Sequence, residues 1–275
     1  MEALTLFQQN FAVAESLLQV HRLFEGLNKA DISDKLRLAI CGEWKAPENS
    51  VVQHARNDRV SVLARATTRI PESLTLKGGL DFLLRQAVVV SCTSLESFFW
   101  DALRENVLTV VRARKSKADA SLRDIPIKLG DFISMEQYED PDLRFRQLIL
   151  KNFERATLYS VESIEDIART LTVYRYWEEI ETIAGGRAKD LRTSVQDLIA
   201  RRNQIAHRAD RPEEGEAADG HGLRPIDYSW TNRHVRDAET IVHASAQIFQ
   251  GAVGSLEAEI QVAQEQELAR KLAKR

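Results

Sequence analysis

Cysteine is nearly absent from this sequence: only Cys41 and Cys92 occur, far apart and without a CxxC spacing. This excludes a disulfide framework and a cysteine zinc site, and it is typical of a reducing compartment. The histidines show no metal-ligand spacing either, so we expect no metal and no cofactor. Neither G-x-x-x-x-G-K-[S/T] nor G-x-G-x-x-G occurs, which argues against nucleotide binding by a phosphate loop.

An excess of charge of one sign is also missing, since 38 Lys and Arg stand against 41 Asp and Glu, for a net charge of -3. A contact with a polyanion would therefore have to come from a local patch. Apolar runs such as residues 87–90 are far shorter than the roughly 18–20 residues that a membrane span needs. The first residues lack a basic region followed by a cleavage site. We expect a cytoplasmic protein that does not contact a membrane.

Glycine and proline are sparse, at 12 and 6 residues, while apolar residues make up 44%. This composition is typical of a mainly helical soluble protein with a well-formed core. Apolar residues recur at helical spacing throughout, and period-2 alternation is not evident. The pattern predicts helices over residues 4–27, 36–40, 51–70, 79–114, 142–157, 163–170, 187–209, 232–251 and 254–275, with a further turn or two within 173–185.

The architecture that these segments predict is all-α, with a four-helix bundle core and additional N-terminal helices. Residues 79–114 contain the most apolar segment and are expected to form a central core helix. Residues 1–75 are expected to be an N-terminal helical extension packed on a helical domain of residues 76–275. Residues 211–230 are acidic and too long for a routine loop, so they are either a functional lid or disordered.

Helix 187–209 carries an arginine in an unexpected place. On a wheel of about 100° per residue, Arg202 falls in the middle of an apolar stripe, which consists of Leu191, Val195, Leu198, Ile205 and Ala209. An unpaired buried guanidinium is very costly, so Arg202 needs a carboxylate, a phosphate or a hydrated subunit interface. Asn203 and His207 are four residues apart and share one flank of the stripe.

Two readings of this helix end remain open. Arg and His are common at helix C-termini because they interact favourably with the dipole and the last carbonyls, which is a purely structural role. Alternatively, Arg202 and His207, about 140° apart on the wheel, spread around the edge of a cleft. A second copy from a facing helix could complete such a site.

The stretch RNQIAH, residues 202–207, resembles the R-[N/D/H]-x-x-x-H signature of the HEPN superfamily (higher eukaryote and prokaryote nucleotide-binding domains). LLRQAVVVSCTSLESFFWDAL is similar to the first core helix of that family. YRYWEEIETIAGG resembles the segment before the motif, and LIARRNQIAHRAD resembles the motif helix. The order and spacing are most similar to the branch known as RiboL-PSP-HEPN, over roughly residues 80–250.

The resemblance implies a metal-independent endoribonuclease, often a toxin or an antiviral-defence effector, that works as a homodimer with its motif helices face to face. Arg202 would neutralise the scissile phosphate, His207 would act as general acid or base, and Asn203 would orient one of them. The RNA products would be a 2′,3′-cyclic phosphate and a 5′-OH. An antitoxin or a defence-system protein is a possible partner.

Three further residues could support this site. Glu96 lies at the edge of the apolar stripe of helix 79–114, where similar helices of the family place a polar residue near the motif arginine; an ordinary flank glutamate is the alternative. Arg201 and Arg208 could add salt-sensitive phosphate contacts, or could simply be solvated surface residues. A different class of function also fits: a catalytically silent helical module that binds RNA, a nucleotide or a protein partner.

Overall fold

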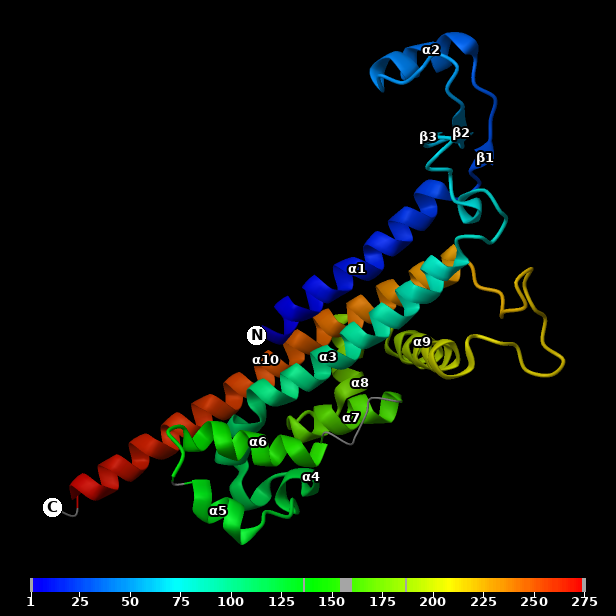
Figure 1. Cartoon of the computed structure of the whole chain (residues 1–275). Coiled ribbons are helices and arrows are strands. Elements are labelled where there is room, and N and C mark those ends of the chain that lie inside the picture. Colours follow the sequence, from blue (N-terminus) through cyan, green and yellow to red (C-terminus); the bar gives the residue numbers. More distant parts are fainter. Residues whose placement is uncertain (1, 136, 154–159, 186, 274–275) are drawn as a thin grey trace. The chain divides into compact units, whose positions relative to one another are not determined.

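The computed structural model describes residues 2–135, 137–153, 160–185 and 187–273 (Figure 1). It is all-α with a small sheet, which confirms the predicted fold class. The helices are α1 Glu2–Phe24, α2 Asp34–Glu43, α3 Asp81–Arg114, α4 Ala120–Arg123, α5 Leu129–Met135, α6 Pro141–Phe153, α7 Val161–Thr170, α8 Tyr176–Ile183, α9 Ala188–Arg208 and α10 Tyr228–Ala273. The strands are β1 Asn28–Lys29, β2 Val52–Arg56 and β3 Ser61–Arg65, and short 3-10 turns occur at η1 Glu72–Leu74 and η2 Lys115–Lys117.

The predicted helix over residues 51–70 is wrong, because β2 and β3 form an antiparallel hairpin there, in a sheet of order β1-β2-β3. The side chain of Asn57 accepts hydrogen bonds from the backbone amides of Arg59 and Val60, both at 2.8 Å. An asparagine that caps a tight turn in this way interrupts a helix, and the valines on either side favour strands.

The two helices predicted over residues 232–251 and 254–275 form one continuous helix, α10. Gly251 and Gly254 lie inside it, where each glycine costs a helix about 1 kcal/mol relative to alanine. Packing of the buried side chains that flank them outweighs this cost; these are Phe249, Val253 and Leu256. At α6 the last predicted positions, 154–157, lie outside the described residues.

Two compact units make up the chain, and α1, α3, α9 and α10 each contribute to both. The first unit consists of Met1–Phe11, Ser91–Ala200 and Arg236–Arg275, and the second of Ala12–Val90 and Arg201–Val235. The sheet, α2 and the end of α9 belong to the second unit. The division at residues 75 and 76 that the sequence suggests stays a prediction.

Aromatic side chains fill the core of the first unit. Phe98 and Phe99 of α3 contact Phe249 of α10, with ring centroids 6.4 and 6.0 Å apart. Tyr176 of α8 packs against Phe99 and Phe249, and its hydroxyl lies 2.7 Å from the Ser245 hydroxyl. Burial raises the pKa of this tyrosine, against the hydrogen bond with Ser245. The buried hydroxyl is therefore satisfied inside the core.

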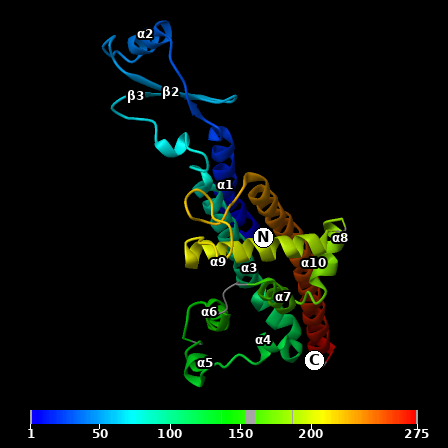
Figure 2. The ribbon, with the colours of Figure 1, turned by 90° about the vertical axis from the view of Figure 1, so that its right-hand side faces the viewer.

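In the first unit α9 lies across α3 and α10 (Figure 2). Just before α9, the Arg187 guanidinium donates to Asp237 of α10 at 2.8 Å. Further along, the Cys92 thiol of α3 donates to the carbonyl of Leu198 at 3.5 Å. The inner face of α9 is fully buried at Leu191, Val195 and Leu198. The first half of the motif helix is thus fixed by the core.

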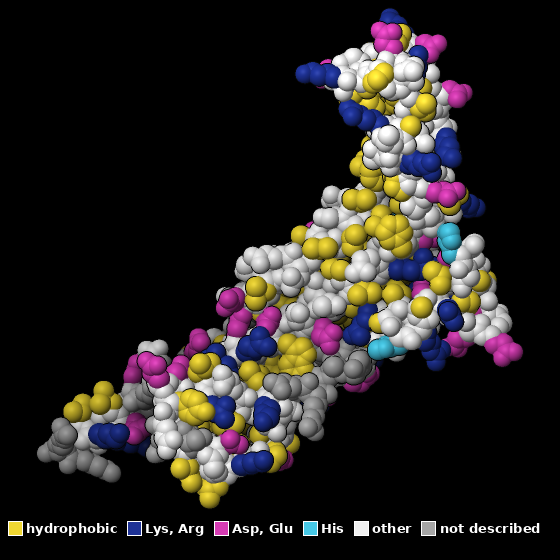
Figure 3. Space-filling view, viewed as in Figure 1, with side chains coloured by type: hydrophobic (Ala, Val, Ile, Leu, Met, Phe, Trp, Pro, Cys, Tyr) yellow, Lys and Arg dark blue, Asp and Glu magenta, His cyan; other side chains and the backbone are white. Residues whose placement is uncertain are grey.

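Among the described helices, α3 together with η2 is long and apolar enough to cross a membrane. Its fully buried side chains are those of a core helix, which fits the central helix of a soluble protein; they include Ala87, Val88, Phe98, Phe99 and Leu103. Over the face shown in Figure 3, Lys and Arg side chains are interspersed with Asp and Glu.

Candidate active site

The motif residues occupy the last two turns of α9, in the second unit. Arg202 and Asn203 are half-buried, and His207 is exposed in the last turn. Asn203 and His207, four residues apart, face the same side of the helix. Within the described part of the chain, the His207 imidazole takes part in no hydrogen bond or ion pair. It is therefore accessible to a ligand from solvent.

The apolar stripe of α9 is fully buried only in the first half of the helix. Leu198 is 0% exposed, whereas Ile205 is half-buried and Ala209 is exposed, one residue beyond the end of α9. Arg202 lies where burial decreases: its Nε atom is buried, while the residue as a whole is half-buried. Part of the Arg202 side chain is thus accessible to solvent.

Arg201, directly before the motif, is bound inside the protein. Its Nη2 atom donates to Asp210 at 2.8 Å and to the carbonyls of Arg224 and Pro225 at 2.9 and 3.1 Å. The side chain is 13% exposed. Burial lowers the pKa of its guanidinium, opposed by the charge of Asp210 and its hydrogen bond. Arg201 is therefore not a solvated surface residue, and its predicted contact with RNA stays a prediction.

The Asp210 carboxylate also accepts a hydrogen bond from a second arginine, Arg85 of α3. The Arg85 Nε atom donates to Asp210 at 2.6 Å, and its Nη2 atom donates to Asp219 at 2.8 Å and to the Arg224 carbonyl at 2.8 Å. The Asp210 side chain is 1% exposed and that of Arg85 10%. Two guanidinium groups and two carboxylates therefore form a neutral buried cluster, which we call the Asp210 cluster (Arg85, Arg201, Asp210 and Asp219).

The backbone of Asp210 ends the motif helix. Ala209 and Asp210 adopt left-handed conformations, with φ of 50° and 57°. The Asp210 N–H donates to the Gln204 carbonyl at 3.1 Å, in the pattern of a Schellman C-cap. The Asp210 carbonyl in turn accepts a hydrogen bond from the Arg224 N–H at 2.8 Å. The chain therefore turns sharply after α9 and is held in that turn on both sides.

The long segment after α9 is held in place by ion pairs. Arg208 binds Glu213 at 2.5 Å, and Arg224 binds Glu216 at 3.0 Å. The Arg208 pair is solvent-exposed, so its contribution to stability is small, and a phosphate could displace the glutamate. Arg208 thus remains a candidate for RNA contact.

Asp219 fixes the middle of the same segment. One carboxylate oxygen accepts the backbone amides of His221 and Leu223 at 2.8 and 2.9 Å, and the other accepts Arg85. Burial raises the pKa of Asp219, but these backbone hydrogen bonds and Arg85 outweigh it and hold that pKa below 3.8. The ionised form is therefore the one that the folded segment prefers.

Glu96, the predicted partner of Arg202, lies half-buried on α3. It belongs to the first unit and Arg202 to the second. The pairing of these two residues stays a prediction.

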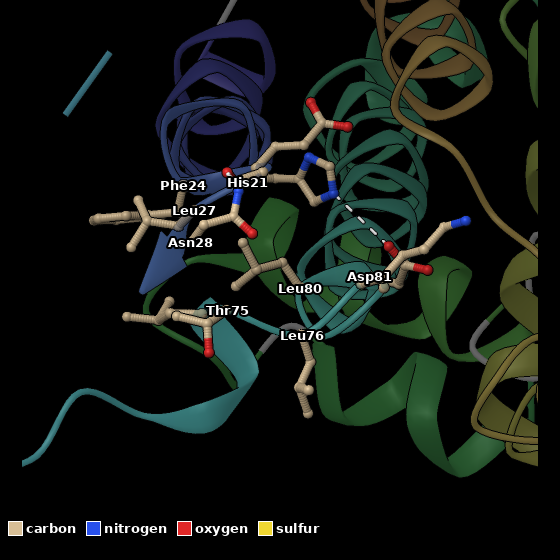
Figure 4. A pocket seen from close by; sticks show the side chains of 13 residues that line it. His21, Phe24, Leu27, Asn28, Thr75, Leu76, Leu80 and Asp81 are labelled. Atoms are coloured by element: carbon tan, nitrogen blue, oxygen red, sulfur yellow. Dashed lines mark hydrogen bonds and ion pairs between the residues drawn. The ribbon is translucent and has the colours of Figure 1, made fainter. Parts of the chain in front are cut away.

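A cavity of about 300 Å³ lies in the second unit, between the end of α1 and the start of α3 (Figure 4). Inside it, His21 points toward Asp81, with 3.8 Å between Nε2 and the carboxylate. Burial raises the pKa of Asp81, against the charges of Arg85 and His21. Since Asp81 and Arg85 are four residues apart on α3, the cavity adjoins the Asp210 cluster.

Sequence reasoning missed Arg85, Asp210 and Asp219. For Arg85 a signal was available, because it interrupts the apolar run LDFLLRQAVVV just as Arg202 interrupts the stripe of α9. A buried arginine predicts a carboxylate partner, but not which one. Among the described residues, no group of three or more His, Cys, Asp or Glu side chains is arranged to hold a metal ion.

The structure is that of an all-α protein, and the family comes from a comparison of its sequence with known families. The family model for RiboL-PSP-HEPN matches residues 55–248, which include residues 202–207. The chain belongs to this family, as its sequence predicts. No curated protein and no solved structure matches it. The family match supports an RNase or a nucleotide-binding module.

Proposed function

We propose that this protein is a metal-independent endoribonuclease that cleaves RNA to 2′,3′-cyclic phosphate and 5′-OH ends. The observation that carries the proposal is the end of α9, where half-buried Arg202 is followed by exposed His207, with Asn203 on the same side as His207. The neighbouring Arg201 is engaged by Asp210. We therefore assign the phosphate to Arg202, the arginine of the motif, and not to Arg201.

The side chains match the chemistry of RNA transesterification. The 2′-oxygen attacks the adjacent phosphorus while a base takes its proton, and the bond from phosphorus to the 5′-oxygen breaks as that oxygen receives a proton. Histidine side chains exchange protons readily near neutral pH, so His207 serves in one of these transfers. The planar fork of Arg202 binds the phosphate and stabilises its growing charge. Asn203 orients the histidine or the phosphate.

A homodimer supplies what one copy lacks. Arg202 and His207 lie about 140° apart around α9, so a single helix presents them to different sides. A second copy with its α9 opposite would bring an arginine and a histidine from different chains to one phosphate.

A protein of this kind acts on cytoplasmic RNA as a toxin or an antiviral-defence effector, and an antitoxin or another defence protein would restrain it. The alternative is a silent module that binds RNA, a nucleotide or a protein through the same surface.

The test is RNA cleavage in EDTA by the wild type and His207→Ala, with His221→Ala as a matched control. His221 is an exposed histidine in the same unit, with no role in the proposed chemistry. We expect the wild type and His221→Ala to produce 2′,3′-cyclic phosphate ends, and His207→Ala to lose at least about 100-fold in rate.

Two results would reject the proposal: a wild type that leaves structured and unstructured RNAs intact, or a His207→Ala variant that cleaves at the wild-type rate. RNA binding without cleavage by the wild type would favour the silent module.

A further inference from the structure

We propose that Asp210 is a positioning residue for the motif: it fixes the last turn of α9, and His207 with it, in the orientation that cleavage requires. This role rests on the proposed ribonuclease function. It is distinct from the catalytic roles of Arg202, Asn203 and His207, because Asp210 acts on the backbone that carries them.

Asp210 contacts three segments of the second unit at once. Its N–H binds the Gln204 carbonyl of α9, and its carbonyl binds the Arg224 N–H in the segment after α9. Its carboxylate binds Arg85 of α3 and Arg201 of α9. The end of α9 is therefore attached both to a neighbouring helix and to the following segment.

The burial of this arrangement makes it rigid. The carboxylate is 1% exposed, and the two arginine side chains that bind it are 10% and 13% exposed. In such surroundings a charge-assisted hydrogen bond is strong, and its loss leaves two buried guanidinium groups undercompensated. An ordinary helix end frays, with local opening that costs little free energy. The contacts that Asp210 makes with Arg85, Arg201 and the Arg224 N–H oppose that opening.

The position of His207 makes this rigidity relevant to chemistry. His207 lies in the last turn of α9, between Gln204 and Asp210, which are joined by the C-cap hydrogen bond. A shift of about 1 Å in a reacting group can cost about 100-fold in rate. Loosening of this turn would therefore lower kcat while the RNA-binding surface stays in place.

Asp210→Asn tests this role with little change in shape. The asparagine oxygen can still accept from Arg85 and Arg201, so the variant chiefly removes the negative charge. Asp219→Asn is the matched control, because it removes the other carboxylate of the Asp210 cluster, which binds Arg85 but not α9. Both dimeric full-length variants are compared with the wild type in kcat, KM and backbone amide exchange over residues 203–208.

We expect Asp210→Asn to lower kcat by about 30- to 100-fold, with KM within about threefold of the wild type. Amide exchange over residues 203–208 should become about tenfold faster. Asp219→Asn should keep kcat within about threefold and leave the exchange of α9 unchanged. Wild-type kcat and wild-type exchange in Asp210→Asn would overturn the proposal, and so would equal losses in the two variants.

If Asp210→Asn does not fold, Arg85→Lys replaces it: the charge is kept and the fork to Asp210 and Asp219 is lost. Arg85→Lys should lose less kcat than we expect for Asp210→Asn, and its amide exchange at the end of α9 should be faster than in the wild type. Wild-type kcat and wild-type exchange in Arg85→Lys would equally overturn the role of Asp210. If the wild type cleaves no RNA, the proposed function fails. The exchange measurement then still decides whether Asp210 orders the helix end.

Discussion

Arg85 and Asp210 are 125 residues apart in the sequence, yet the Arg85 Nε atom donates to the Asp210 carboxylate at 2.6 Å. This contact joins the first turns of α3 to the residue that ends α9. The same helix, α9, carries the proposed active site. A buried ion pair therefore anchors the end of α9 that carries His207.

The two consecutive arginines of the motif helix should respond differently to the same substitution. Arg201→Lys shortens the side chain and removes the Nη2 atom that donates to Asp210 and two backbone carbonyls, so we expect the free energy of unfolding to fall by about 1–3 kcal/mol. Arg202→Lys should retain more stability but lose about 100-fold in RNA cleavage, because lysine cannot bind the phosphate bidentately. Urea unfolding and single-turnover cleavage measure the two effects. The reverse order of stability would contradict the assignment of Arg201 as the structural arginine.

A composite site makes a prediction about mixed dimers. Arg202→Ala and His207→Ala should each be inactive alone. If Arg202 and His207 come from different copies, a mixed dimer has one intact site, so a one-to-one mixture should regain about a quarter of the wild-type activity. The measurement is RNA cleavage after the two purified variants have exchanged subunits, with each variant alone as control. No recovery despite confirmed exchange would place both residues of a site on one copy.

The segment after α9 should loosen in acid. The pKa of Asp219 is held below its ordinary value of 3.8, chiefly by the backbone amides of Leu223 and His221 against the effect of burial. A carboxyl with a lowered folded-state pKa contributes stability that is complete above 3.8 and is lost as pH falls through the lower value. We expect amide exchange over residues 211–227, corrected for intrinsic rates, to speed up only at the acid end of a series from about pH 6 to about pH 3.

The control for this acid effect is Asp219→Asn, in which the segment should already be loose at neutral pH and should change less with acid. Asp81 changes stability with pH in the opposite direction. Burial raises its pKa, so its ionised form lowers the stability of the fold above the folded-state pKa. Protonation in acid removes that destabilisation. A segment that loosens at the same pH in the wild type and in Asp219→Asn would show that another group is responsible.

Local patterns were enough to predict the main helices and to single out Arg202, whereas the roles of Arg202, Asn203 and His207 stay predictions. The apolar periodicity of α3 and α9 is long and regular, and Arg202 is conspicuous because its position in the stripe conflicts with its charge. The contacts of Asp210 could not be predicted in this way. A helical wheel describes one helix, whereas the partner of Asp210 on α3 is set by tertiary packing.

The hairpin was missed for a reason that is visible in its burial. Val52 and Ala55, the buried residues of β2, are three positions apart, which fits a helix as well as an irregular strand. The turn between the strands rests on Asn57, whose role depends on contacts outside the hairpin. Its amide nitrogen donates to the carbonyls of Leu23 and Glu25 at the end of α1, at 2.9 and 3.0 Å.

Asn57 also provides a comparison with the motif, because Arg56–Asn57 repeats the Arg–Asn pair of residues 202 and 203 but has no histidine after it. Its side chain makes four hydrogen bonds, two as donor and two as acceptor. We therefore expect Asn57→Ala to lower the free energy of unfolding by about 2 kcal/mol. RNA cleavage at saturating substrate should be unchanged. Asp58→Ala, on the same turn and exposed, is the control and should stay within about 0.5 kcal/mol of the wild type. Denaturant unfolding and cleavage assays on the two variants check this, and a loss of cleavage in folded Asn57→Ala would mean that the hairpin takes part in RNA recognition.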